Sequence, residues 1–175
     1  MKRLELSFAD ALQFVLRVEG GFYPGDKPAD PNPTMYGITE RVYHVWRRRN
    51  DMPPRLVKDI SEDELWLIFY SWYWQPIWGA KLPHRLAVAL FDMAVNSGPR
   101  AAVGTLQGVV GTATDGIMGP KTLAAVLAAN QATLAEDFLW ARVAFYRKTV
   151  QANIVKLPVL PGWLARLEQL REHIA

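Results

Sequence analysis

The segment HRLAVALFDMAVNS, residues 84–97, is apolar around most of its circumference when it is drawn as a helix. A helix with one apolar face lies at the surface of a core, whereas a helix that is apolar on nearly all sides is normally central and buried. We therefore expect the rest of the chain to pack around this segment. Its polar side chains Asp92 and Asn96 lie four residues apart on one face, and buried polar groups there must find hydrogen-bond partners.

Helical patterns flank this segment on both sides. A first helix is expected to begin at a capping box of Ser7 with Asp10 and to end at the glycines 20–21. A second capping box, SEDE at 61–64, opens another helix. Further helices are expected at about 40–50, from Pro99 to Val110, from Pro120, over 131–154 with its apolar face on Leu134, Phe138, Ala141 and Phe145, and at about 162–173. Strand signal is limited to a short hairpin near 34–39, so the predicted fold class is all-α.

Composition excludes several classes of function. The chain has 175 residues, which fits one compact domain or one domain with a small appended subdomain. Its net charge of +3 is too weak a basic bias to indicate a nucleic-acid partner, although it favours a polyanion such as a bacterial cell wall. No cysteine is present, and His44, His84 and His173 lie far apart in the sequence. We therefore expect no metal site and no cofactor.

The hydropathy of the chain indicates neither a membrane span nor a signal peptide. No stretch approaches the roughly 20 apolar residues of a membrane span, so no stable membrane association is expected. The first residues, MKRLELSFADALQ, are interrupted by Glu5 and Asp10 and do not resemble a signal peptide. The expectation is a protein, monomeric in solution, that is synthesised in the cytoplasm and reaches the wall only after release.

Glu19 is the residue at which the sequence itself points to catalysis. It follows Val15 by four residues and Leu16 by three, so it lies on the apolar stripe of the first helix, at the C-terminus where the helix dipole disfavours negative charge. Partial burial and the dipole both favour the protonated form that a general acid needs near neutral pH. The alternative is a structural Glu paired with an arginine such as Arg17 or Arg41. Position alone does not separate the two.

Several motifs, in order along the chain, resemble one known family. EGGF at 19–22, Asp30-Pro31 and TMYGIT at 34–39 are similar to the signature of the glycoside hydrolase family 108 N-acetylmuramidases, found in phages and prophages. Further matches are Tyr73-Trp74, LFDMAVNSG at 90–98 and Leu106-Gln107. DGIMGPKTL at 115–123 resembles the peptidoglycan-binding region that follows in these proteins. The resemblance covers nearly the whole chain.

The resemblance implies a lysozyme-like helical fold, with a catalytic region over 1–97 and a helical peptidoglycan-binding region over 98–175, packed into one globular unit. It implies that Glu19 is the general acid. Asp30 would stabilise the developing positive charge or orient water, and Thr34 would position that water. Where the family usually has two glycines after Asp-Pro, this chain has Asn32-Pro33 and is one residue shorter. The alternative for Asp30 is a turn-forming residue.

Other polar and aromatic residues are candidates for contacts with sugars. Asp92 is expected to anchor the active-site loop, and Asn96 to contact the ligand or that loop. The remaining candidates for substrate binding are Tyr36, Thr39, Tyr73 and Trp74, although each aromatic residue alone is more often part of a core.

The expected activity is hydrolysis of the β-1,4 bond between N-acetylmuramic acid and N-acetylglucosamine in peptidoglycan, as in a phage endolysin that a holin releases. One alternative is a lytic transglycosylase, which leaves anhydromuramic ends. Another is a wall-binding module without activity.

Overall fold

The computed structural model describes residues 3–26 and 32–175 of the chain. Its elements, in chain order, are α1 (Arg3–Glu19), β1 (Phe22–Tyr23), β2 (Thr34–Met35), β3 (Ile38–Thr39), α2 (Glu40–Arg49), η1 (Val57–Asp59), α3 (Glu62–Phe69), the π-helical turn η2 (Tyr70–Trp74), η3 (Gly79–Lys81), α4 (His84–Ser97), α5 (Pro99–Val109), α6 (Pro120–Ala128), α7 (Leu134–Ala152), η4 (Ile154–Val159) and α8 (Leu160–His173). The described residues are thus mainly helical, which confirms the predicted fold class.

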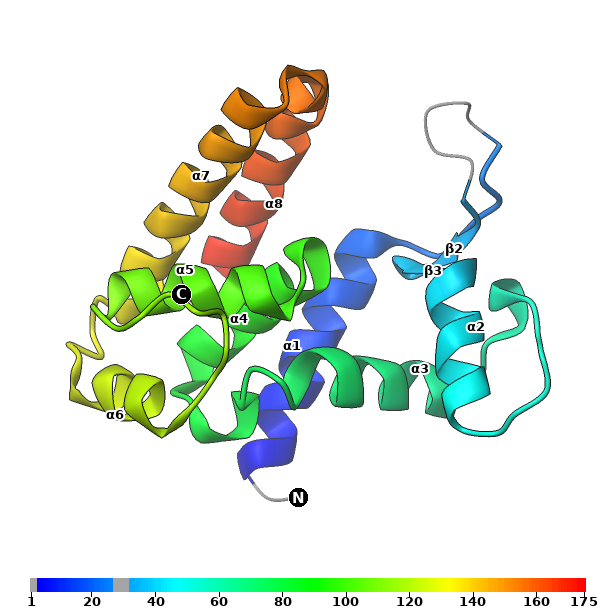
Figure 1. The fold of residues 1–175 in the computed structure, drawn as a ribbon, viewed down its shortest axis with the longest axis horizontal. Coiled ribbons are helices and arrows are strands. Elements are labelled where there is room, and N and C mark those ends of the chain that lie inside the picture. The colour runs from blue at the N-terminus through cyan, green and yellow to red at the C-terminus, as the bar shows by residue number, and fades with distance from the viewer. Residues whose placement is uncertain (1–2, 27–31) are drawn as a thin grey trace.

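Helix α4 lies at the centre, as its sequence predicts. Every residue from Leu86 to Ala94 is buried, and α1, α5 and α7 pack against the helix. Figure 1 shows α4 crossing α1 in the middle of the molecule. The core is therefore assembled from both the first half and the last half of the chain.

A small antiparallel sheet follows α1. Strand β2 pairs with β3 in the register Thr34↔Thr39, which confirms the predicted hairpin. Strand β1, which the sequence did not indicate, adds a third strand through the pair Tyr23↔Thr34. The turn between β2 and β3 consists of Tyr36 and Gly37, both with positive φ, as a two-residue hairpin turn requires.

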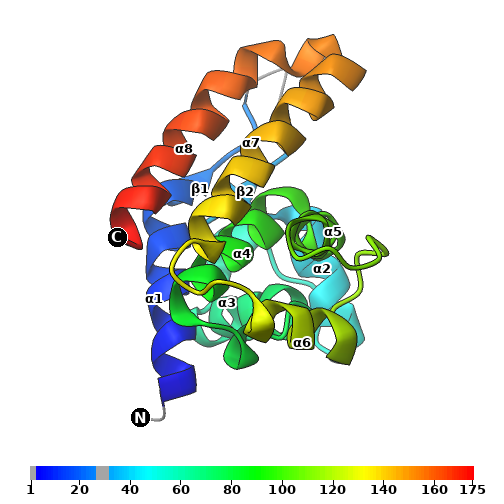
Figure 2. The ribbon, with the colours of Figure 1, turned by 90° about the vertical axis from the view of Figure 1, so that its left-hand side faces the viewer.

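Helices α7 and α8 form a long antiparallel hairpin, the α7–α8 hairpin. Figures 1 and 2 show it projecting from the helical body, with the C-terminal end of α8 returning beside α1. Nε2 of His173 on α8 lies 3.1 Å from Oδ1 of Asp10 on α1. The last helix of the chain thus contacts the first.

Two local predictions differ from the structure. Helix α1 already includes Arg3, so Ser7 is not a helix cap; its hydroxyl lies 3.0 Å from the His84 ring instead. In α7 the predicted apolar face was partly wrong, because Phe138 is buried with Arg142 and Tyr146 rather than with Ala141 and Phe145. A salt bridge to Asp92 makes burial of Arg142 possible, and sequence periodicity does not reveal such a partner.

Candidate active site

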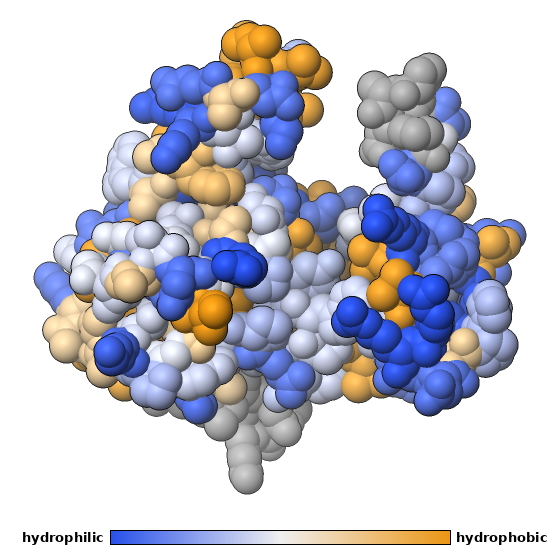
Figure 3. Space-filling model, in the orientation of Figure 1, coloured by the Kyte–Doolittle hydropathy of each residue, from blue (hydrophilic) through white to orange (hydrophobic). Residues whose placement is uncertain are grey.

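Glu19 is the last residue of α1, and its side chain lies between α8 and the turn that joins β2 to β3. In Figure 3 the surface is hollowed between the α7–α8 hairpin and the lobe that carries α2, and Figure 1 shows α1 ending at the floor of this hollow. The Glu19 side chain is 20% exposed. The carboxyl group is therefore largely covered by protein, and a fifth of the side chain remains exposed.

The carboxylate of Glu19 is paired with an arginine from the other end of the chain. Nη1 of Arg166, on α8, donates to Oε1 of Glu19 at 2.6 Å. From the sequence we considered a structural pairing of Glu19 with an arginine such as Arg17 or Arg41, but neither of these is its partner. Arg17 lies over the ring of Phe14 instead, and Arg41 is exposed on α2.

Arg166 also binds Asp92, the polar residue buried in α4. Its Nε and Nη2 atoms lie 2.9 and 2.7 Å from Asp92 Oδ1. On the opposite side, Nη1 of Arg142 lies 2.6 Å from Asp92 Oδ2. One fully buried carboxylate thus holds two guanidinium groups, and one of these reaches Glu19.

The pKa values in this network reflect strong pairing. Burial alone would raise the pKa of Asp92, but the charges of Arg142 and Arg166 outweigh it and lower the pKa below its usual value. Burial alone would lower the pKa of Arg166, but Asp92 and Glu19 raise it above its usual value. Asp92 and Arg166 are therefore ionised at neutral pH.

The network continues to Asn96 through a tyrosine. Nε of Arg142 donates to the Tyr146 hydroxyl at 2.7 Å, and that hydroxyl donates to Oδ1 of Asn96 at 2.8 Å. The ring of Trp163 stacks on Tyr146 with a centroid distance of 4.8 Å. The α7–α8 hairpin is thus fixed to the polar face of α4 by both charge and hydrogen bonding.

The second oxygen of Glu19 faces the turn between β2 and β3. A Cβ atom added to Gly37 would lie 2.7 Å from Oε2 of Glu19. The backbone at Gly37 also has φ +78°, a conformation that L side chains rarely adopt. Glycine is therefore required here both for the turn and for its close approach to the carboxyl group.

Tyr73 interacts electrostatically with Glu19. It belongs to the π-helical turn η2, in which the amide of Gln75 donates to the carbonyl of Tyr70, five residues earlier. Burial raises the pKa of the Tyr73 hydroxyl, and the negative charge of Glu19 raises it further. Tyr73 is therefore neutral at neutral pH.

The other predicted site residues are distributed differently. Thr34 lies in β2, at the end of the hairpin away from the Gly37 turn. The Thr39 hydroxyl accepts a hydrogen bond from Val42 N at 3.2 Å and caps α2, which is a structural role. Asp30 lies outside the described residues.

The aromatic candidates also differ from one another. Tyr36 is partly buried in the β2–β3 turn, at positive φ. Trp74 is buried, 1% exposed, and packs against Phe8 and Phe91. The prediction that Trp74 stacks on a sugar is wrong for this structure, because the core encloses its ring.

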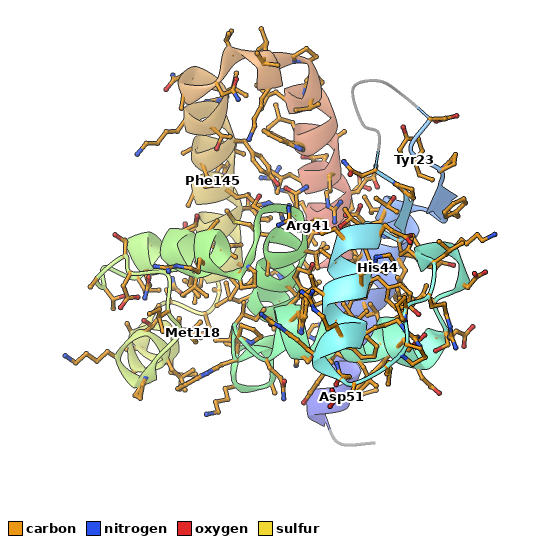
Figure 4. The ribbon with its side chains drawn as sticks, turned by 45° about the vertical axis from the view of Figure 1, so that its right-hand side comes forward. Tyr23, Arg41, His44, Asp51, Met118 and Phe145 are labelled. Atoms are coloured by element: carbon orange, nitrogen blue, oxygen red, sulfur yellow. The ribbon has the colours of Figure 1, made fainter. Side chains whose placement is uncertain are left out.

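A pocket of about 800 Å³ lies away from Glu19. It runs along α2, between residues of that helix such as Arg41 and His44 and the following segment at Asp51 and Met52. Figure 4 shows Arg41 and His44 on successive turns of α2, with Asp51 beyond its end. We locate the candidate site at Glu19 because the buried charges of Asp92 and Arg166 converge there.

Sequence reasoning missed Arg142 and Arg166. Each lies on a helical stripe between apolar residues, Arg142 with Phe138 and Tyr146, and Arg166 with Leu170. A charged residue on an apolar stripe is rarely buried unless it is paired, so this position was a usable signal. In the described ranges 3–26 and 32–175, no cluster of three or more His, Asp or Glu residues could hold a metal ion.

Comparisons with known proteins assign the chain to a family. Residues 12–98 match the family model described as glycosyl hydrolase 108, and residues 101–168 match a predicted peptidoglycan domain. None of the curated proteins compared with the chain is similar enough to count as a match.

One solved structure is similar over nearly the whole length. The structure of SagA from Brucella abortus has 30% sequence identity to this chain and a TM-score of 0.81, and the match covers 97% of this chain and 94% of SagA. The chain therefore belongs to the glycosyl hydrolase 108 family, and its C-terminal region carries the predicted peptidoglycan domain.

Proposed function

We propose that the protein hydrolyses the β-1,4 bond between N-acetylmuramic acid and N-acetylglucosamine in peptidoglycan, with Glu19 as the general acid. The observation that supports this most directly is the position of Glu19, a mostly covered carboxyl group at the end of α1 that is held between Arg166 and the β2–β3 turn. Membership of a glycosyl hydrolase family and the predicted peptidoglycan domain support the substrate class.

In this proposal Arg166 fixes the orientation of the acid. It holds Oε1 of Glu19, so Oε2 is the oxygen that carries the proton to the leaving glycosidic oxygen. Once the proton has been transferred, the guanidinium stabilises the carboxylate that remains. Arg166 is thus a positioning residue for the acid.

The charge of Arg166 is shared between two carboxyl groups. Besides Glu19 it contacts Asp92, which lies within 2.7 Å and is held by Arg142 as well. A glycan bound at the site would cover the exposed fifth of the Glu19 side chain and exclude water from it.

Asp92 is not the second catalytic group. It lies close to Glu19 through Arg166, but its side chain is 0% exposed and both of its oxygens face guanidinium groups. For these roles we propose the residues to which the family resemblance points: Thr34 and Asp30 would position the attacking water and stabilise the developing positive charge.

We further propose that the enzyme acts on the bacterial cell wall. A chain that combines a glycosyl hydrolase 108 region with a predicted peptidoglycan domain suits an enzyme that acts on the cell wall after release, such as an endolysin. The predicted peptidoglycan domain would hold the enzyme on its polymeric substrate.

Mass spectrometry of the fragments released from purified peptidoglycan tests which bond is cleaved. Hydrolysis at the proposed bond gives fragments with reducing N-acetylmuramic acid ends. Anhydromuramic ends would show a lytic transglycosylase, and reducing N-acetylglucosamine ends would show cleavage of the other glycosidic bond. Either result would overturn the proposed reaction.

A further inference from the structure

The tip of the α7–α8 hairpin exposes a group of aliphatic side chains. Four of the six residues of η4 form this apolar tip: Ile154, Val155, Leu157 and Val159, which are 67, 81, 50 and 48% exposed. Figure 3 shows them as an orange cap at the top of the hairpin. Single exposed apolar side chains are ordinary, whereas a contiguous exposed patch indicates an interaction site.

The tip is an ordered part of the fold. Oδ1 of Asn153 accepts a hydrogen bond from Val155 N at 3.3 Å and caps η4, and Pro158 and Pro161 restrict the backbone around it. Leu160, the next residue, turns inward and packs against the core. The four aliphatic side chains are therefore held outward by the local structure.

The charge around the tip has a single sign. The sequence contains no Asp or Glu between Asp137 and Glu168. Exposed cations are Lys156 within the tip and Arg147 and Lys148 near the end of α7. Among the described residues, none of these three cations forms an ion pair.

We propose that the apolar tip binds the surface of an anionic phospholipid bilayer. The aliphatic side chains would enter the boundary between headgroups and acyl chains, and the three cations would contact the headgroup phosphates. The tip is convex and lies at the end of an arm, so it suits a deformable surface. Peptidoglycan offers a polar polymer and has no apolar phase for these side chains.

The apolar tip would contact only the surface of the bilayer. No helix in the described part of the chain is long and apolar enough to span a membrane. Hydropathy along the sequence led us to expect no stable membrane association, because it detects long apolar segments and η4 has only six residues. Along α8 the tip lies about 10 Å from Arg166, so a docked protein would hold its candidate site near the bilayer.

Vesicle sedimentation with the full chain tests the proposal. The parent is expected to sediment with vesicles of equal phosphatidylglycerol and phosphatidylcholine, and much less with phosphatidylcholine alone. The double variant Ile154→Ser with Val155→Ser should bind at least about tenfold more weakly. These positions are exposed, so the variant should melt at the parent's temperature. Leu127→Ser, at an exposed aliphatic residue of α6, is the matched control and should bind as the parent does.

Equal sedimentation of parent and double variant, no sedimentation of the parent, or equal binding to both vesicle types would overturn the proposal. A dimer that the double variant abolishes, without vesicle binding by the parent, would show that a second copy occupies the tip. The proposal is independent of the proposed function: vesicle binding by a chain that releases no fragments from peptidoglycan would contradict the function alone.

Discussion

Glu19 and Arg166 lie 147 positions apart in the chain and form an ion pair of 2.6 Å. The first comes from the region that matches glycosyl hydrolase 108, and the second from the region that matches the predicted peptidoglycan domain. The candidate acid is therefore completed by the C-terminal region, which would serve both to bind the wall and to hold the carboxyl group in place.

Replacement of Arg166 by Met should slow the cleavage of peptidoglycan. The maximal rate should fall about tenfold, because the charge-assisted hydrogen bond that orients the Glu19 carboxyl group is lost. Initial rates of peptidoglycan solubilisation by parent and variant would measure this effect, and thermal melts would establish that the variant is folded.

Arg171→Met is the matched control, since this arginine lies on the same helix and pairs with Glu136 and Glu168 at the surface. It should leave the rate unchanged. Equal rates for folded Arg166→Met and the parent would contradict a role of Arg166 in positioning the acid.

Gly37→Ala should impair activity more than stability. The new methyl group would lie 2.7 Å from Oε2 of Glu19 and must displace the carboxyl group or the turn. The strained backbone should cost about 1–2 kcal/mol of unfolding free energy. Gly21→Ala is the control, because nothing lies within 4 Å of its added Cβ. Similar activities of the two variants, with both still folded, would argue against the close contact between the turn and the acid.

Asp92→Asn should destabilise the fold by about 3–5 kcal/mol at pH 7, because two buried guanidinium groups lose their counter-charge. The pKa of Asp92 is lowered in the folded protein, so its stabilising effect is present above the unfolded value of about 4 and is lost as the pH falls through the folded value. Urea unfolding should show a large gap between parent and variant at pH 7 that narrows below pH 4. A gap that stays constant on acidification would contradict this account of Asp92.

The elements that could be predicted from the sequence are those encoded by local pattern. Residues 84–97 are apolar around most of the helix circumference, and this pattern indicated the central helix α4. The capping box at Ser61 and the prolines at 99 and 120 indicated where three other helices begin. All four predictions are confirmed. Strand β1 was missed because two residues carry too little periodicity. Ser7 was misassigned because α1 extends further toward the N-terminus than a capping pattern at Ser7 allows.

The site was predictable only in part, because its partners lie far apart in sequence. The apolar pattern of the first helix and the glycines after it correctly predicted that Glu19 is the last residue of α1. Nothing local to Glu19 points to Arg166, and nothing local to Asp92 points to Arg142, since these contacts depend on how the α7–α8 hairpin returns to α4 and α1. Trp74 shows the opposite problem, because a motif match does not reveal that the side chain is enclosed by Phe8 and Phe91.

The most direct test of the central claim is the rate at which Glu19→Gln releases fragments from purified peptidoglycan. The amide keeps the size of the side chain but has no acidic proton, so we predict a loss of about 10²–10⁴-fold, with Glu172→Gln, at an exposed position of α8, as active as the parent. Thermal melts would establish that both variants are folded. Release by folded Glu19→Gln at the parent's rate would contradict the claim that Glu19 is the catalytic acid.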